Sequence, residues 1–193
     1  MTKSIDQELI LQLQAGSLEA LGQLYDHYQL LVYRTALAVT GDSDAAADLL
    51  QDVFLRLYRF AENIDPGRPI EPWLYRMTTN LAYTYVKRRR RWLGPMEELV
   101  EWITEAGKNS PSEEIEQNEE WQPVQRAISR LPLPQRIVIV LYYLNDLSLQ
   151  EIAQITEIPV GTVKSRLHYG RQSLKKSLGL HGDQPLDLTF EMP

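Results

Sequence analysis

The sequence contains no cysteine, which excludes disulfides and thiolate metal ligands and fits a reducing compartment. Its longest hydrophobic run, residues 137–144, is too short to cross a bilayer, and no cationic leader precedes an apolar stretch at the N-terminus. The three histidines are scattered, and no glycine-rich phosphate loop is present. We therefore expect a cytoplasmic protein that is not an enzyme, does not insert in a membrane, and holds no cofactor or metal.

The formal net charge is -6, but positively and negatively charged residues are unevenly distributed along the chain. Residues 56–92 contain nine Lys and Arg against three Asp and Glu, and residues 126–178 contain eight against three. Between these blocks, residues 96–120 contain nine Glu and a single Lys. Two basic blocks divided by an acidic one indicate two DNA-contacting modules joined by a segment that avoids DNA.

Apolar residues recur with helical spacing along most of the chain, and no sustained alternation of period two is present. The sequence therefore predicts an all-α protein in which two small helical domains are joined by a linker. We expect an N-terminal helical domain over residues 1–92, an acidic linker over 93–120, a C-terminal helix-turn-helix domain over 121–178 and a tail over 179–193. In the first domain, helices are expected over 5–14, 18–40, 44–60 and 73–92.

The most informative segment covers residues 147–178, where two short helical patterns are joined by a turn. Ser148 and Glu151 form the capping-box pattern that begins the first helix. Pro159 marks the start of the second, because proline is tolerated at a first helical position but not inside a helix. Projection of the second helix gives an apolar stripe that should face the core. The stripe consists of Val163, Leu167, Gly170, Leu174 and Leu178.

The opposite side of this second helix carries cations and hydrogen-bonding side chains. In a helix-turn-helix such residues read base edges in the major groove and hold phosphates. The candidates are Lys164, Ser165, Arg166, His168, Tyr169, Arg171 and Gln172. The alternative is an ordinary helical hairpin with a solvated basic face.

A second cationic helix is expected where the sequence reads NLAYTYVKRRRRW from Asn80. An amide, a hydroxyl and cations at spacings of three and four residues suit a nucleic-acid strand, because the amide can pair with a base edge while the cations hold phosphates. The candidates are Asn80, Thr84, Lys87, Arg88 and Arg91. Tyr75, Tyr83, Tyr85 and Trp92 are candidates for base stacking or for core packing. The five consecutive cations alternatively form a general phosphate-binding or acidic-protein patch.

The loop before this helix is a candidate pocket for one unstacked base, with walls from Ile64, Arg68 and Ile70. The expected helix over 44–60 has a core-facing arc of Leu49, Leu50, Val53, Phe54, Leu57 and Phe60. Its opposite arc contains Asp48, Gln51, Asp52, Leu55, Arg56 and Arg59. A helix face with one leucine among charged residues is either a protein-docking surface or a plain solvated face. Asp48 and Asp52 lack the companion ligands that a metal site needs.

Three segments, in this order, resemble the small extracytoplasmic-function (ECF) group of bacterial RNA polymerase sigma factors. AADLLQDVFLRLYR (46–59) is similar to the segment that docks on the polymerase, which implies core-polymerase binding by Asp48, Gln51 and Asp52, with Leu55 and Arg56 beside them. PWLYRMTTNLAYTYVKRRRR (72–91) is similar to the helix that recognises and opens the minus-10 element, with Asn80 as a base contact. Residues 131–174 resemble the minus-35 reader, most specifically in IPVGTVKSRLH.

The resemblance implies a subunit that binds core RNA polymerase and promoter DNA, as duplex at minus-35 and as a single strand at minus-10. It also implies an anti-sigma partner. Family members often carry Asp or Asn where this chain has Thr84, which leaves the minus-10 preference open, and alanine where it has Gly170. One alternative is a stand-alone dimeric helix-turn-helix regulator with a helical sensor domain, which would bind two half-sites unaided. Another is a sequestration or adaptor protein that imitates a sigma factor.

Overall fold

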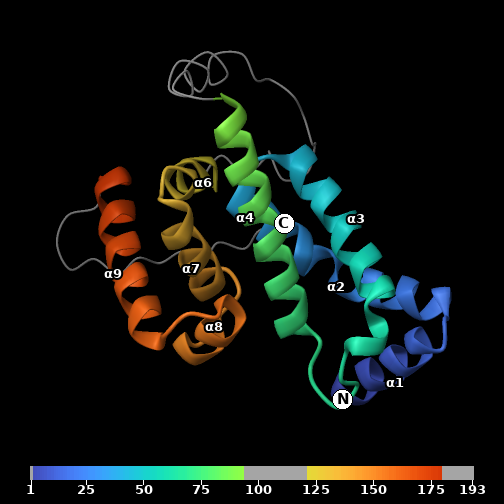
Figure 1. Cartoon of the computed structure of the whole chain (residues 1–193). Helices are drawn as coiled ribbons and strands as arrows, with labels where there is room; N and C mark the ends of the chain where they lie inside the picture. The colour runs from blue at the N-terminus through green and yellow to red at the C-terminus, as the bar shows by residue number, and fades with distance from the viewer. Residues whose placement is uncertain (1, 94–120, 180–193) are drawn as a thin grey trace.

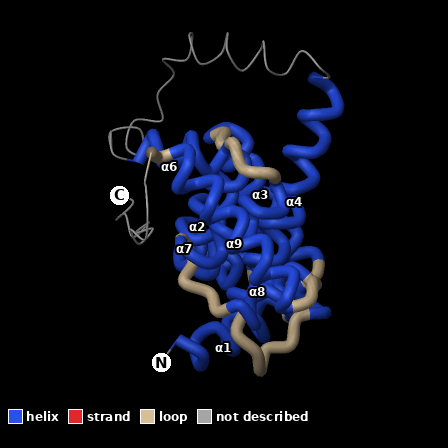
Figure 2. Tube along the Cα trace, turned by 90° about the vertical axis from the view of Figure 1, so that its left-hand side faces the viewer, coloured by secondary structure: helices blue, strands red, loops and turns tan. Residues whose placement is uncertain are grey.

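The computed structural model describes residues 2–93 and 121–179. Within these ranges the chain forms helices and loops without any strand (Figure 2), which confirms the all-α prediction. The elements are α1 (Thr2–Gln14), α2 (Leu18–Thr40), α3 (Ser43–Arg59), the 3-10 helix η1 (Ala61–Asn63), α4 (Glu71–Leu93), α6 (Trp121–Ser129), α7 (Leu133–Tyr143), α8 (Leu149–Thr156) and α9 (Val160–Ser177). The predicted linker beyond Leu93 and the predicted tail beyond Gly179 lie outside the described residues.

Capping side chains explain where α2 and α3 of the first module begin. The Ser17 hydroxyl accepts a hydrogen bond from the Ala20 N–H at 3.2 Å, and the Asp42 carboxylate accepts one from the Ala45 N–H at 3.1 Å. Both satisfy backbone donors that a helix N-terminus leaves without a partner. Between them, Gly41 ends α2 with a φ of 70°, a left-handed conformation that favours glycine.

The first module (α1 to α4) packs α1, α3 and α4 around α2, over a cluster that includes the fully buried Leu24, Leu57 and Leu74. One polar contact fixes α1 within this cluster: the Tyr28 hydroxyl donates to the Asp6 carboxylate at 2.7 Å, and both residues are buried. Burial, reinforced by that hydrogen bond, raises the pKa of Tyr28.

The second module (α6 to α9) contains the helix-turn-helix. Ser148 and Glu151 form both bonds of the capping box, and Glu157 makes the turn with a φ of 54° before α9 begins at Val160. The predicted stripe of α9 faces the core, since Val163, Leu167, Gly170 and Leu174 are all buried; Leu178 is half-buried. The sequence prediction of the helix-turn-helix is confirmed, except that Pro159 is the N-cap residue and not the first residue of the second helix.

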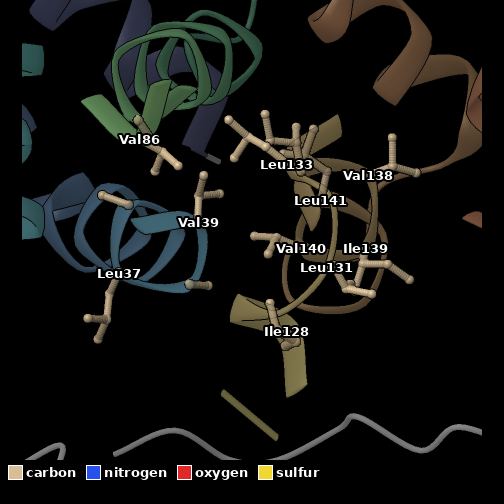
Figure 3. Packing of buried hydrophobic residues seen from close by; sticks show 14 of the residues in the cluster. Leu37, Val39, Val86, Ile128, Leu131, Leu133, Val138, Ile139, Val140 and Leu141 are labelled. Carbon is tan, nitrogen blue, oxygen red and sulfur yellow. The ribbon is translucent and has the colours of Figure 1, made fainter. Parts of the chain in front are cut away.

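The two modules pack against each other, with α6, α7 and α8 beside α2 and α4 (Figure 1). One hydrophobic cluster continues from the first module into the second. At its centre Val39 of α2 lies between Val86 of α4 and the apolar side chains of α7, including Val140 (Figure 3). All three valines are buried, so the modules exclude water where they meet.

Polar contacts accompany this inter-module interface. The Arg136 guanidinium, 3% exposed, donates from Nη1 to the Val39 carbonyl at 2.8 Å and from Nη2 to the carbonyls of Ser129 and Leu131. Val39 and Ser129 lie at the C-termini of α2 and α6, where helices leave carbonyls without partners and a cation is favourable. One buried cation therefore joins helix ends from both modules.

Candidate nucleic-acid and protein interfaces

Helix α9 presents most of its predicted DNA-contacting residues to solvent. Lys164, Ser165, His168, Tyr169 and Gln172 are exposed, while Arg166 is half-buried. The Ser165 hydroxyl donates to the carbonyls of Gly161 and Thr162, at 3.2 and 3.0 Å, so its oxygen can still accept a bond from outside. The His168 and Gln172 side chains contact each other at 3.2 Å on the same face. The arrangement matches a reader helix with one buried and one free face.

Arg171 differs from its neighbours because the second module already holds it. Its Nε donates to the Tyr143 hydroxyl at 2.7 Å, and its guanidinium lies 5.0 and 5.3 Å from the ring centres of Tyr142 and Tyr143. Because these contacts already restrict the side chain, Arg171 would lose less conformational entropy on binding a phosphate. Arginine has further N–H donors beyond Nε, so a phosphate contact stays chemically available.

The predicted ridge on α4 is exposed along its length: Asn80, Thr84, Lys87, Arg88 and Arg91. The last turns of α4 extend beyond the neighbouring helices (Figure 2). Thr84 donates its hydroxyl to the Asn80 carbonyl at 2.8 Å, and the Lys87 ammonium lies 5.1 Å from the centre of the Tyr83 ring. The Asn80 amide therefore lies on an open cationic surface.

The aromatic residues of α4 divide between core and surface. Tyr75 is 7% exposed and belongs to the core, Tyr83 and Tyr85 are half-buried, and Trp92 is 79% exposed. Tyr85 and Arg89 both contact the Asp42 carboxylate, with Arg89 Nη1 at 2.6 Å. Burial and the nearby Asp42 charge raise the pKa of Tyr85. Of the four aromatics, Trp92 has the exposure that base stacking requires.

The structure corrects the predicted pocket in the loop before α4. Ile64 and Ile70 are 8% and 1% exposed and pack in the core, so neither side chain lines an open pocket. Gln14 of α1 holds this loop by donating to the Ile64 carbonyl at 2.8 Å. Only Arg68 of the predicted walls is exposed, and it pairs with Asp65 at 3.1 Å. The two isoleucines anchor the loop, and Arg68 is the member that DNA could reach.

On α3, the predicted docking face is open to solvent. Asp48, Gln51 and Asp52 are exposed, Leu55 is 64% exposed, and Arg56 is half-buried. A surface hollow of about 450 Å³ lies at the C-terminal end of this face. Its lining residues are Asp52, Leu55, Arg56, Tyr58, Arg59 and Phe60. An exposed leucine beside a hollow suits a protein partner.

One core prediction on α3 is wrong. Phe60 was expected on the core-facing arc, but it is 41% exposed. Helix α3 ends at Arg59, and the φ and ψ of Phe60 (-107° and 13°) take it off the helical projection. Phe60 and Tyr58 instead add aromatic surface around Leu55. Tyr58 follows Leu55 by three residues, which places the two side chains next to each other on a helix surface. This spacing is the sequence signal that could have added Tyr58 to the predicted docking face.

Within the described residues, no group of three His, Asp or Glu side chains is arranged to hold a metal ion. None of the described helices combines the length and apolar character needed to span a bilayer.

Family models match both modules: sigma-70 region 2 over residues 24–92 and sigma-70 region 4 over residues 121–174. The chain is 34% identical to the ECF RNA polymerase sigma factor SigW of Bacillus subtilis, over 88% of this chain and 94% of that protein. It is 31% identical to SigM of the same organism, over 79% and 91%. The chain belongs to the ECF group of the sigma-70 family of RNA polymerase sigma factors.

Solved structures show the same fold. The structure of CnrH in complex with the cytosolic domain of CnrY gives a TM-score of 0.66 at 22% identity, covering 92% of this chain and 99% of that one. The sigma factor RpoE from Bartonella quintana, crystallised with the anti-sigma factor NepR, gives 0.65 at 22% identity, covering 83% and 98%.

Proposed function

We propose that this sigma factor uses three separate surfaces to start transcription. The exposed face of α3, centred on Asp48, Gln51, Asp52 and Leu55, binds core RNA polymerase. The α4 ridge, with Asn80 as the base-reading residue, captures the single-stranded minus-10 element. The exposed face of α9 reads the duplex minus-35 element. Residues 1–92 and 121–178 thus act as two promoter-binding domains joined by the acidic segment between them.

The observation that best supports three separate surfaces is that each of the three sets of candidate residues is exposed on a different helix. The α4 ridge combines one amide with cations, which suits a strand whose bases are unpaired. Helix α9 instead follows a capped helix and a turn, the arrangement that enters a major groove. A stand-alone regulator has no use for the α4 ridge and the α3 face together, so the sigma-factor role fits the chain better.

Strand opening in this proposal needs no nucleotide hydrolysis by the chain. Unstacking a base costs a few kcal/mol, and contacts to the unpaired strand offset that cost. The polymerase carries out phosphoryl transfer, and the chain supplies selectivity. Because the polymerase acts on chromosomal DNA, we place the protein in the cytoplasm. We also infer an anti-sigma partner, as in the complex of RpoE with NepR.

Run-off transcription with core polymerase, on a library of genomic fragments, tests the role and defines the promoter. The Asn80→Ala variant should keep core binding but lose most opening of the minus-10 region, measured by permanganate footprinting. Alanine favours helix more than asparagine, so unfolding of α4 cannot account for the loss. Gln23→Ala, an exposed amide on α2, is the matched control. An unchanged footprint in Asn80→Ala would remove the assignment of Asn80 as the base contact.

A further inference from the structure

The cationic end of α4 extends past the core that holds the rest of the helix. Among residues 71–92, burial ends at Val86, and residues 87–92 are all exposed. Lys87 and Arg91, which are proposed to hold phosphates, lie on this outer part. A helix end that lacks packing partners frays and opens locally. A contact beyond Val86 is therefore needed to keep the cations of the ridge in place.

Asp42 supplies such a contact from the loop between α2 and α3. Its Oδ2 accepts a hydrogen bond from the Tyr85 hydroxyl at 3.2 Å and pairs with Arg89 Nη1 at 2.6 Å. Its Oδ1 caps α3 by accepting from the Ala45 N–H, and its own N–H donates to the Thr40 hydroxyl at 3.3 Å. The Asp42 side chain is 17% exposed, so little water competes for the carboxylate. One largely buried carboxylate thus joins the start of α3 to the outer part of α4.

Tyr85 and Arg89 lie on the back of α4 relative to the ridge. At about 100° per residue, Arg89 is about 180° around the helix from Asn80, and Tyr85 is about 140° from it. Since Tyr85 and Arg89 are four residues apart, both face the start of α3, which lies beside this part of α4 (Figure 1). A helix held at its back leaves Asn80, Lys87 and Arg91 facing outward. The five consecutive cations of α4 are therefore not equivalent.

We propose that Asp42 is a positioning residue for strand capture, and that Arg89 is its structural partner and not a DNA contact. The proposal rests on the proposed function of the α4 ridge. By holding the back of α4, the carboxylate keeps the ridge directed at the strand and fixes α4 to the helix that binds core polymerase. The Arg89 side chain is 44% exposed, so the ion pair gives only modest stabilisation. We therefore expect its loss to lower strand opening by about two- to fivefold and not to abolish it.

Asp42→Ser removes the contact to α4 while preserving the helix cap. Serine is about as good an N-cap as aspartate, so α3 keeps its start, but the shorter side chain does not reach Arg89. The matched control is Asp44→Ser, which removes an exposed acid from the first turn of the same helix. Removal of an acid by itself favours DNA binding, so a loss of opening confined to Asp42→Ser cannot come from net charge.

Permanganate footprints of polymerase–promoter complexes, with core capture measured in parallel, give the first readout. Asp42→Ser and Arg89→Ala should each lower reactivity at minus-10 by about two- to fivefold, with core capture unchanged. The double variant should lose no more than either single variant, because both changes remove the same contact. Additive losses, or wild-type opening in either single variant, would overturn the proposal. Absence of opening and of transcript with the wild-type chain would instead contradict the proposed function itself.

The salt dependence of promoter binding separates a positioning role from a phosphate contact. Each phosphate contact contributes about 1 to the slope of the log binding constant against log salt concentration. Arg89→Ala should leave this slope unchanged, whereas Arg88→Ala, which removes an exposed cation of the proposed DNA surface, should reduce its magnitude by about 1. An equal reduction by both variants would identify Arg89 as a DNA contact and overturn the proposal.

Hydrogen exchange in the free chain tests the support of the helix end without polymerase or DNA. Backbone amides of residues 87–91 should exchange faster in Asp42→Ser and Arg89→Ala than in the wild type, because local opening of this end becomes easier. Amides of residues 78–82, which lie in the packed part of α4, should exchange at the wild-type rate. Wild-type exchange at residues 87–91 in both variants would also overturn the proposal, because Asp42 would then not hold this end of α4.

Discussion

Gly170 on α9 offers a quantitative test of how closely α7 and α9 pack. A Cβ added there would lie 2.8 Å from Cγ1 of Ile139, closer than Cβ atoms approach in real structures, and 3.1 Å from Cδ1, which is tighter than most such contacts. Gly170→Ala gains about 1 kcal/mol of helix propensity, but overpacking a core typically costs about 1–3 kcal/mol. We expect the variant to lower the free energy of unfolding by up to about 2 kcal/mol.

The matched control is Gly161→Ala in the same helix, where an added Cβ meets nothing within 4 Å. That variant should raise the free energy of unfolding by up to about 1 kcal/mol. Urea unfolding followed by circular dichroism measures both effects, provided the denaturant slope stays constant. In an Ile139→Ala background the methyl at position 170 has space, so Gly170→Ala should become stabilising. Stabilisation by Gly170→Ala in the wild-type background, equal to that by Gly161→Ala, would refute close packing at Ile139.

Three further predictions concern the surfaces and the helix cap. Reversal of charge at Asp48 and Asp52 to lysine should sharply reduce co-purification with core polymerase, while Asp26→Lys, an exposed acid on α2, should not; equal retention of all variants would contradict the α3 assignment. The hydroxyl and the backbone N–H of Ser148 donate hydrogen bonds to the Glu151 carboxylate and hold its pKa below the ordinary value of 4.5. The carboxylate therefore stabilises the fold above pH 4.5, and this contribution is lost as the pH falls through the lowered pKa of the folded state. The difference in unfolding free energy between wild type and Glu151→Gln should therefore shrink below pH 4.5, and a constant difference down to pH 3 would exclude the capping carboxylate as its source. Removal of the Arg171 side chain should weaken the binding of a minus-35 duplex to the polymerase-bound chain. If the guanidinium contacts a phosphate, the slope of the log binding constant against log salt concentration should also fall in magnitude by about 1. An unchanged slope would limit Arg171 to the packing of α7 against α9.

The helices could be predicted from the sequence because their signals are local. Ser17, Asp42 and Ser148 cap the helices that follow them, and the stripe of α9 repeats with helical spacing. The prediction for Phe60 is wrong because helix α3 ends one residue earlier, and helix ends depend on backbone geometry that a projection ignores.

The inter-module interface could not be predicted because its partners are far apart in the chain. Thr35 and Asn145 are separated by 110 positions, and neither has a neighbouring pattern that indicates the other. The loop residues Ile64 and Ile70 show a related limit. An apolar residue in a loop can line a pocket or anchor the loop, and only the packing of α1, α3 and α4 shows that these two are buried.

Promoter binding measured with and without core polymerase tests the central claim most directly. Labelled promoter fragments selected by run-off transcription are titrated with the isolated chain, with core polymerase and with both together. We predict that selective binding and transcription require both components, because the two modules that carry the reading surfaces pack against each other in the isolated chain. Tight, selective binding by the isolated chain, unchanged when core polymerase is added, would contradict the account.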